Sequence, residues 1–389
     1  MNRAALAQDV RYRLLNPAKY HASRLLATGG GTTVKVLIAT DGQAYTSEQQ
    51  LAGFTSYAAD LRRAGVVTIR QRLADVLRSP ASVLPRYDVA LVKMSFKTPD
   101  AEAERVVRTL SQAKGSAKLV YCDGDDDPCV QWPAILPWVD LYLKKHAFTD
   151  PAMYGADLLG KTNLTDYVIR HHGISIAGDP RQHAGVVPPD QRGKIFVGWN
   201  IGLDDKIAKL WRENRDRPDG PRTYDVVCRA AVRDDWTKPL RGPVTGILSN
   251  LSDRLKVLLP TERVNPEQYY QELRSGLMCV SPFGYGETCW RDFESILCRT
   301  LLIKPDMGHL RTVPDVFRPY ETYVPCKWDF SDLEAVCLQW QADAQGRQRI
   351  VDQAYRLFDD FLANNRFVER VTAMLARLGI PTRAGPAAP

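Results

Sequence analysis

One segment of this sequence, residues 277–306, concentrates residues whose types and spacing could do chemistry. It reads LMCVSPFGYGETCWRDFESILCRTLLIKPD, which predicts a buried strand, a loop with two glycines, a helix and a second strand. The glycines permit a close backbone approach to a ligand, and the start of the helix offers amide groups to a phosphate. We therefore expect four loop residues to border a phosphate-bearing ligand: Ser281, Gly284, Tyr285 and Gly286.

The helix, expected over residues 287–298, carries charged residues on one face. Glu287, Arg291 and Glu294 stand at positions i, i+4 and i+7, while Trp290 begins an apolar face suited to the core. Two carboxylates that bracket an arginine could form a solvated ion-pair ladder, worth about 0.3–0.5 kcal/mol for each pair. Their place after a glycine loop, at the carboxyl end of a strand, favours a binding function.

Basic residues follow the strand expected over residues 224–230. Cations at this strand end would stabilise the negative charge that develops on a leaving phosphate group. Arg229, at the end of the strand, is the first candidate for that role. Candidates of lower rank, each of which could be an ordinary surface cation, are Arg233, Lys238 and Arg241.

Polar residues also follow strands expected in the first half of the chain. Asp41 comes after the strand at 34–40 and could orient a hydroxyl group, act as a base, or simply cap a turn. Lys144 and Lys145 follow the strand at 141–143 and could meet a carboxylate or phosphate.

The run Asp123-Gly-Asp-Asp-Asp127 follows the strand at 118–122 and admits three interpretations. It could bind a divalent cation that grips a diphosphate. It could instead supply Asp123 as a nucleophile and Asp125 as an acid or base in phosphoryl transfer. The interpretation that we rank first is an acidic loop beside a ligand cleft, where the carboxylates position an acceptor. EF-hand spacing fails because Pro128 occupies the position that requires glycine.

Short β-branched runs alternate with helical patterns along the chain, which is typical of parallel sheets flanked by helices. The expected strands are 34–40, 66–69, 88–94, 118–122, 141–143 and 195–199, then 224–230, 255–259, 276–280, 301–304 and 322–325. They predict the α/β class, with two Rossmann-like doubly wound domains in tandem and a helical C-terminal tail. We expect an acceptor-side domain over 1–205, a polar linker over 206–222, a donor domain over 223–331 and helices over 332–389 that pack back across the domains.

Composition limits the classes of protein to consider. The 389 residues are 44% apolar and 25% charged, the balance of a soluble globular protein, and no window resembles a membrane span. The eight cysteines form no CxxC pair and no zinc-binding spacing, which indicates a reducing compartment, the cytoplasm.

The charge pattern is modest and gives few indications of a macromolecular partner. The net charge of +7 comes without a basic stripe interleaved with aromatic residues, so a nucleic-acid partner is not expected. The basic segment 1–26 could touch an anionic membrane at its inner face, or could be an ordinary capping segment.

The loop and helix of residues 281–294 resemble the donor-binding element of GT-B glycosyltransferases, especially the CgeB-like and group 1 relatives. The resemblance lies in SPFGYGE, RDFE and the following LIKPD. In these enzymes the second of two glutamates holds the donor ribose, and the first lies near the transferred sugar. This implies ribose binding by Glu294 and a sugar or phosphate contact for Glu287. The two glutamates are separated by six residues here instead of the common seven, so Glu294 matches more directly.

The resemblance implies transfer of a sugar from a nucleotide-sugar donor to a cell-surface glycan or glycolipid, with retained configuration and without a metal or cofactor. The implied catalytic residues are Glu287, Arg229 and Asp41. The implied donor-binding residues are Ser281, Gly284, Tyr285, Gly286, Arg291, Glu294, Lys238 and Arg241, and the acceptor-side candidates are Asp123, Asp125, Lys144 and Lys145. Two rivals stay open: a haloacid-dehalogenase-like phosphotransferase using Asp123 and Asp125, and a non-catalytic glycan- or nucleotide-binding protein.

Overall fold

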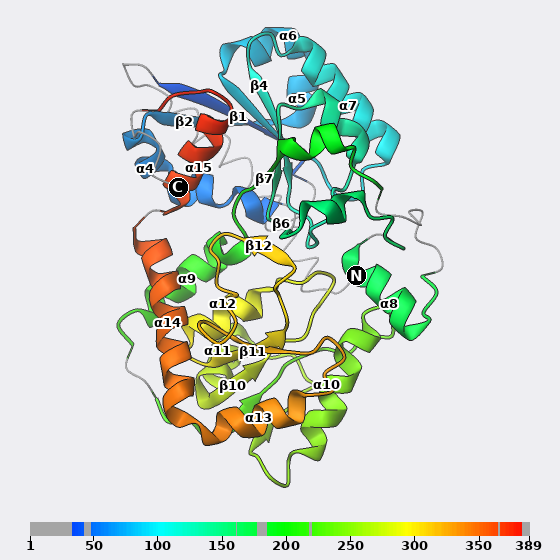
Figure 1. Ribbon diagram of the computed structural model, residues 1–389. Helices are drawn as coiled ribbons and strands as arrows, with labels where there is room; N and C mark the ends of the chain where they lie inside the picture. The colour runs from blue at the N-terminus through cyan, green and yellow to red at the C-terminus, as the bar shows by residue number, and fades with distance from the viewer. Residues whose placement is uncertain are drawn as a thin grey trace.

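The structure is a computed structural model that describes residues 33–42, 48–160, 162–176, 185–217, 220–364 and 366–382. Within these residues, two parallel sheets flanked by helices lie one beyond the other along the molecule (Figure 1). The predicted α/β class, with two Rossmann-like domains in tandem and a helical C-terminal tail, is confirmed. The basic segment 1–26, which we considered as a membrane contact, lies outside the described residues.

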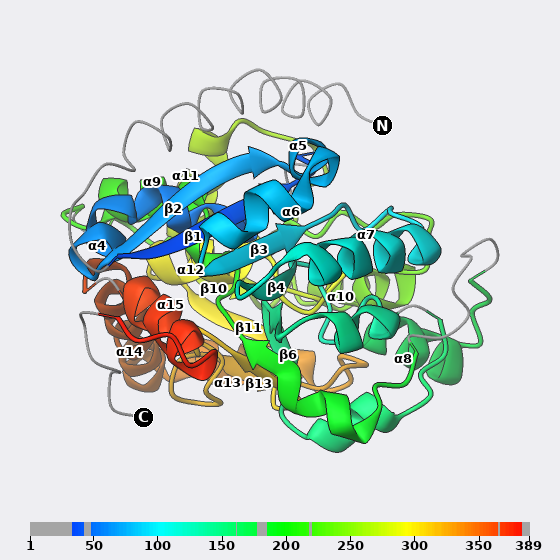
Figure 2. The same cartoon turned by 90° about the horizontal axis from the view of Figure 1, so that it is seen from above.

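The first sheet has six parallel strands in the order β2-β1-β3-β4-β5-β7. Their bounds are β1 Val34–Thr40, β2 Val66–Arg72, β3 Val89–Lys93, β4 Lys118–Asp123, β5 Leu141–Lys144 and β7 Ile195–Val197. The strands read as nearly continuous apolar runs because helices cover both faces of the sheet. The view from above shows α5 (Leu73–Arg78), α6 (Pro80–Val83) and α7 (Asp100–Ala113) along one face (Figure 2).

The region between β1 and β2 forms short helical pieces in its described part. They are a 3-10 turn at Gln49–Leu51, α3 at Gly53–Ser56 and α4 at Ala58–Arg63. Here the ring of Phe367 comes so close that a Cβ atom at Gly53 would lie 2.6 Å from it. The region is therefore shaped by packing against the C-terminal helix α15 (Arg366–Arg377), which local sequence does not reveal.

The second sheet has five parallel strands in the order β13-β11-β10-β8-β9. Their bounds are β8 Tyr224–Val227, β9 Val257–Leu258, β10 Gly276–Val280, β11 Leu301–Pro305 and β13 Val324–Cys326. Its helices are α10 Lys238–Asn250, α11 Pro266–Ser275 and α12 Trp290–Leu297. The first half of the polar segment 206–222, expected as a linker, is helical, because α9 spans Asp205–Asn214 and packs against α12.

Helix α12 begins three residues later than we predicted, and this corrects the shared-face argument. Cys289 is the N-cap residue and has an extended backbone conformation. Its backbone N–H donates a hydrogen bond to the side chain of Asp292. This capping box fixes the helix start at Trp290. Glu287 therefore lies in the preceding loop and does not share a helix face with Arg291 and Glu294.

The two domains are joined by more than the chain crossing. Strand β6 (His146–Phe148) of the first domain pairs antiparallel with β12 (Leu310–Thr312) of the second, a two-stranded sheet that the sequence did not predict. One core cluster runs from the first sheet through α9 and α12 to the C-terminal helices. The C-terminal helices in this cluster are α14 Ala344–Ala363 and α15, and Phe367 of α15 packs edge-on against Phe54 and Trp199. Helix α13 (Leu333–Ala342) packs into the separate core of the second sheet.

The domains also touch at a glycine. A Cβ atom at Gly286, in the loop after β10, would lie 1.7 Å from the carbonyl oxygen of Asp126, in the loop after β4. Only glycine permits this approach of two backbones. All eight cysteines are free thiols, and none of the described helices is long and apolar enough to cross a membrane.

The Gly286 contact yields a prediction. Gly286→Ala must push the two loops apart, and we expect it to lower the free energy of unfolding by about 1–3 kcal/mol. Gly246→Ala is the matched control, because Gly246 lies within α10 and a Cβ atom there meets nothing within 4 Å. The control should raise stability by about 0.5–1 kcal/mol. Thermal unfolding of both variants checks this, and an unchanged Gly286→Ala midpoint would contradict the contact.

Candidate functional site

The start of α12 is held by a buried carboxylate. Asp292 accepts hydrogen bonds from the Cys289 amide at 2.9 Å and the Ser281 hydroxyl at 2.6 Å, and it forms an ion pair with Lys304 at 3.2 Å. The Asp292 and Lys304 side chains are fully buried. The Ser281 hydroxyl, which we expected to face a ligand, is therefore engaged in orienting the helix.

The glycine loop is held open by an arginine from α10. Arg241 donates from Nε to the carbonyl oxygen of Phe283 at 2.8 Å, and its Nη2 lies 2.6 Å from the place of a Cβ atom at Gly284. A larger residue at position 284 would therefore require the end of the Arg241 side chain to shift. The next residue, Tyr285, is 47% exposed and donates its hydroxyl to Asp235.

Glu287 lies fully buried where the two domains meet. Its Oε1 accepts a hydrogen bond from Asn163 of α8 (Asn163–His172) at 3.0 Å and lies 3.4 Å from Nε2 of His309. Its Oε2 is buried and has no hydrogen-bond partner within the described chain. A buried carboxylate oxygen without a donor is costly, so this atom is suited to accept a hydrogen bond from a bound molecule.

Glu294 points away from Glu287, toward α11 and α9. Its Oε2 accepts a hydrogen bond from the Tyr269 hydroxyl at 2.8 Å, and Oε1 accepts from Tyr270 at 3.3 Å and from Lys206 at 2.5 Å. The residue is only 2% exposed. A carboxylate offers about four lone-pair positions, so one position on Oε2 is left for a further donor.

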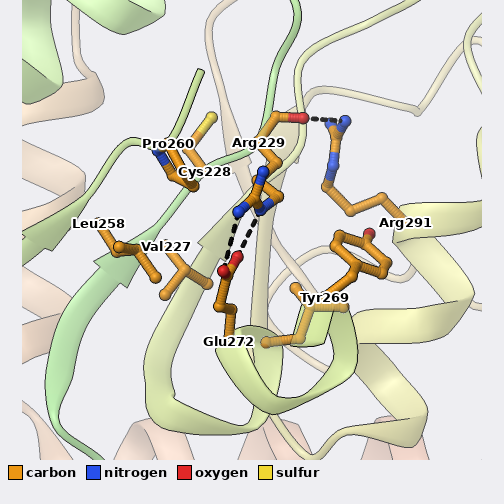
Figure 3. A pocket seen from close by; sticks show the side chains of 9 residues that line it. Val227, Cys228, Arg229, Leu258, Pro260, Tyr269, Glu272 and Arg291 are labelled. Atoms are coloured by element: carbon orange, nitrogen blue, oxygen red, sulfur yellow. Dashed lines mark hydrogen bonds and ion pairs between the residues drawn. The ribbon is translucent and has the colours of Figure 1, made fainter. Parts of the chain in front are cut away.

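Arg229, our first candidate for a phosphate-binding cation, is neutralised in the structure. Its guanidinium forms a two-pronged pair with Glu272, with Nη2 at 2.8 Å from Oε1, and it also donates to the carbonyl oxygen of Glu262. Figure 3 shows this pair pointing down to α11, while Arg291 approaches the carbonyl oxygen of Arg229 from the opposite side, at 2.6 Å.

These residues surround a small hollow beyond the end of β8. Its lining combines apolar side chains with three charged ones: Val227, Cys228, Arg229, Leu258, Pro260, Tyr269, Glu272, Leu273 and Arg291 (Figure 3). Tyr269 therefore borders both the hollow and the carboxylate of Glu294.

Two other cations lack a carboxylate. Within the described chain, Arg241 and Arg291 form no ion pair, and the Nε of Arg291 is buried without a hydrogen-bond partner. Burial, followed by the positive charge of Arg291, lowers the pKa of Arg241. The charge of Arg291 thus disfavours the charged form of Arg241, whereas, against the effect of burial, the pKa of Arg291 itself is raised by the polar groups around it. An anion bound beside Arg241 would offset this repulsion. Of the lower-ranked cations, Lys238 pairs with Asp234 and Arg233 donates to the Tyr285 hydroxyl.

In the first domain, Asp123 and Lys144 form a buried pair at the carboxyl ends of β4 and β5. Asp123 Oδ2 accepts from Lys144 at 3.0 Å and from the Tyr142 hydroxyl at 2.6 Å, and Oδ1 accepts from the Asp125 amide. Although burial acts in the opposite direction, Lys144 and these hydrogen bonds lower the pKa of Asp123. A nucleophile has to present an oxygen to its substrate, and this side chain is 0% exposed.

The remaining acceptor-side candidates lie closer to the domain contact. Lys145 forms an ion pair with Asp126 at 2.5 Å, next to the Gly286 contact. Asp41 accepts a hydrogen bond from the Ser95 amide at 2.6 Å, a contact that joins the loops after β1 and β3 and does not form a local turn. The structure thus brings Lys145 and the loop of Asp125 to the contact with the second domain, and it places Lys144 in the core.

Several residues of the site escaped the sequence analysis. Asn163 and His309 reach Glu287, while Tyr269, Tyr270 and Lys206 reach Glu294. Asn163 follows a Thr162 capping box, a recognisable helix start, but nothing local indicates that this start faces the other domain. Within the described residues, no group of three or more His, Cys, Asp or Glu side chains is arranged to hold a metal ion.

Comparisons with known proteins find similarity in backbone structure and none in sequence. No protein-family model and no curated protein matches the sequence. A solved alpha-glucosyltransferase with UDP and DNA aligns at 8% identity and a TM-score of 0.48, covering 86% of this chain and 98% of that one. A glycosyltransferase from Rickettsia africae aligns at 9% identity and a TM-score of 0.46, covering 90% of this chain and 99% of that one. TarM of S. aureus, with UDP and saccharides bound, aligns at 8% identity and a TM-score of 0.44. The alignment covers 78% of this chain and 58% of that one. All three likenesses come with low sequence identity.

The acidic loop gives a prediction about pH. Burial, together with the charges of Asp125, Asp123 and Glu287 and against that of Lys144, raises the pKa of Asp127 from 3.8 to about 7. The folded protein therefore binds more protons than the unfolded chain between about pH 4 and 7, so ionisation of Asp127 lowers the free energy of unfolding as pH rises through this window.

Asp127→Asn removes this ionisable group and keeps an oxygen for the Cys129 amide. We expect the variant to gain stability over the native protein between pH 5 and 8, by at least about 1.4 kcal/mol, the equivalent of one pKa unit. Thermal unfolding across this range measures the difference. Asp234→Asn is the control, since that side chain is 94% exposed. A difference between Asp127→Asn and the native protein that stays constant with pH would contradict the assignment.

Proposed function

We propose that this protein is a glycosyltransferase that moves a sugar from a nucleotide-activated donor to a glycan or glycolipid acceptor. The observation that carries the proposal is the environment of the Glu287 carboxylate. Its Oε2 is buried and has no hydrogen-bond partner within the described chain, and the residue lies between the two α/β domains, beside Asn163 and His309. A sugar hydroxyl is a neutral hydrogen-bond donor of the kind that this oxygen requires.

Aromatic side chains next to Glu287 support a sugar contact. Trp328 is partly exposed and packs edge-on against His309, Phe283 and Tyr167, with ring centroids 5.0 Å apart in each case. Aromatic rings offer apolar faces to sugar rings, while a carboxylate and an imidazole accept or donate to the hydroxyl groups. We therefore place the transferred sugar between Glu287 and this aromatic group.

The donor nucleotide is assigned to the rest of the second domain. Glu294 retains one lone-pair position for a ribose hydroxyl, and Tyr269 and Leu258 offer apolar contacts to a base at the mouth of the small hollow that they line. Arg241 and Arg291 supply the positive charge for the phosphates. In this proposal they take the role for which Arg229 was the first candidate, because Glu272 already neutralises Arg229.

The reaction follows from this placement. The bond between the anomeric carbon and the phosphate oxygen breaks, and a bond from the acceptor hydroxyl oxygen to the anomeric carbon forms. The acceptor oxygen bonds on the face from which the phosphate departs, so the configuration is retained. Its proton passes to the departing phosphate oxygen, so no enzymic base is needed. Arg241 and Arg291 stabilise the negative charge that develops on the leaving nucleotide. These fixed cations also make the proposed transfer independent of a metal.

The Glu294 assignment predicts a loss of donor affinity. Glu294→Gln keeps the side-chain volume and a hydrogen bond with Tyr269 but removes the charged acceptor for a ribose hydroxyl. We expect the affinity for the best-bound nucleotide-sugar to fall about tenfold or more. The donor is first identified by thermal shift with UDP-, GDP-, dTDP-, ADP- and CMP-sugars, because a ligand stabilises the folded state by mass action. Affinities are then measured by calorimetry.

Lys206→Met is the matched control, since it breaks the same ion pair from the other side and leaves the carboxylate in place. It should leave donor affinity within about twofold. Equal losses in the two variants would indicate that Glu294 acts only through the local fold. Unchanged affinity in Glu294→Gln would refute the ribose assignment.

The mechanism predicts the stereochemistry of the product. With an α-linked nucleotide-sugar, proton NMR of the product should show an α-glycosidic linkage, and a chelator should leave the rate unchanged. A β-linked product would refute retention. Full dependence on an added divalent cation would show that Arg241 and Arg291 are not sufficient for the phosphates.

A further inference from the structure

A second, larger groove lies at the junction of the domains. It encloses about 750 Å³. Its walls come from three elements: β7, the segment 307–321 that includes β12, and α15. None of the groups assigned to the donor nucleotide lines it. A volume of this size accommodates a ligand of several rings.

The groove contains two cations without acidic partners. Arg311 is exposed, and Arg370 donates from Nε to the carbonyl oxygens of Val197 and Gly198, at 2.8 and 3.2 Å. Within the described chain, no carboxylate forms an ion pair with either of them. Burial, and then the charge of Arg311, lowers the pKa of Arg370. These two guanidinium groups line the same groove and repel each other, and a bound anion would offset that repulsion.

The third arginine of the groove differs from these two. Arg318 pairs with Asp315 at 3.2 Å, and both side chains are half exposed. Its charge is thus already balanced. The positive field of the groove arises at Arg311 and Arg370, and Arg318 is an internal reference for the same residue type in the same groove.

The wall of the groove is partly apolar. Ile195 and Phe196 of β7 are half-buried, and the guanidinium of Arg370 lies 4.2 Å from the centroid of the Phe196 ring. The exposed Thr149 and Glu321 add polar groups. Apolar surface, hydrogen-bonding groups and unbalanced cations together suit a sugar that carries an acidic substituent.

One short segment separates the groove from the proposed sugar site. Gly308 and Leu310 line the groove, whereas the His309 side chain between them reaches Glu287 at 3.4 Å. Hydrogen bonds from Thr149 to the carbonyl oxygens of Gly308 and His309 hold this segment against β6. The groove therefore lies behind the backbone that supports the reaction centre.

We propose that this groove binds an acidic saccharide, with its phosphate or carboxylate group on Arg311 and Arg370, as the remote part of the acceptor. The inference rests on the proposed function, since it assigns the class of acceptor to that reaction. The two cations require an anionic group on the ligand, and the half-apolar wall suits a sugar ring. A phosphate and a carboxylate substituent both supply the negative charge, and the experiment below distinguishes between them.

The test measures equilibrium binding at low salt to the full chain by calorimetry. The probes are glucose 6-phosphate, a glucuronate-containing disaccharide, neutral maltose and inorganic phosphate. We expect one of the acidic saccharides to bind at least about tenfold more tightly than both maltose and inorganic phosphate. The better of the two identifies the acidic group.

Arg311→Gln should weaken that binding about tenfold, whereas Arg318→Gln should change it less than about threefold. Arg311 is exposed, so its substitution leaves the core intact, and a thermal midpoint verifies this. Binding that shows no preference for acidic saccharides, or that survives Arg311→Gln, would overturn the proposal. Equal binding of inorganic phosphate would reduce the groove to a plain anion site and overturn the saccharide assignment.

Nucleotide-sugar hydrolysis by the same variants separates the two proposals. Hydrolysis without acidic-saccharide binding would overturn the groove assignment and leave the proposed function standing. Acidic-saccharide binding without any nucleotide-sugar binding or hydrolysis would refute the proposed function, and with it the role of the groove as an acceptor site.

Discussion

The buried carboxylate of Asp292 sets the geometry of the second domain's functional edge. It ties together the end of β10 through Ser281, the start of α12 through Cys289, and β11 through Lys304. Removing two charges from water costs several kcal/mol for each ion, and only close, multiple hydrogen bonds offset that cost. Because this set fixes where α12 begins, Glu287 is left in the loop facing the first domain. Glu294, seven positions later, points to α11 instead.

The position of Glu287 then depends on the contact between domains. Asn163 reaches it from α8, and the backbones of Gly286 and Asp126 meet where no side chain could fit. The β6–β12 pair and the shared core maintain this arrangement from the other side. The candidate sugar site is therefore composed of both domains, and neither domain contains it alone.

The arginines of this protein differ in whether a carboxylate already balances their charge, and this difference decides where an anion can bind. Arg229 and Arg318 have carboxylate partners, so they add little positive potential at the surface that they border. Arg241 and Arg291 near the glycine loop, and Arg370 with Arg311 in the groove, form two like-charged pairs without such partners among the described residues. Anionic ligands are favoured at these two places for the same electrostatic reason, although the surrounding side chains differ.

The sequence by itself determined the fold class and indicated the region of the candidate site. Alternation of β-branched runs with helical patterns is a local property, and it gave the two parallel sheets with strand positions close to those observed. The two glycines and the helix after β10 were likewise visible, because close backbone approach and helix starts depend on nearby residues.

The tertiary structure decided which charged groups are engaged and which remain available. Glu272 neutralises Arg229 from 43 residues away, Tyr142 and Lys144 hold Asp123 in the core, and His309 joins Glu287 through the β6–β12 pairing. Each of these contacts joins segments distant in sequence. Hydrogen bonds and ion pairs act over a few ångströms in space, and spacing along the chain constrains that distance only within a turn, a helix face or a strand.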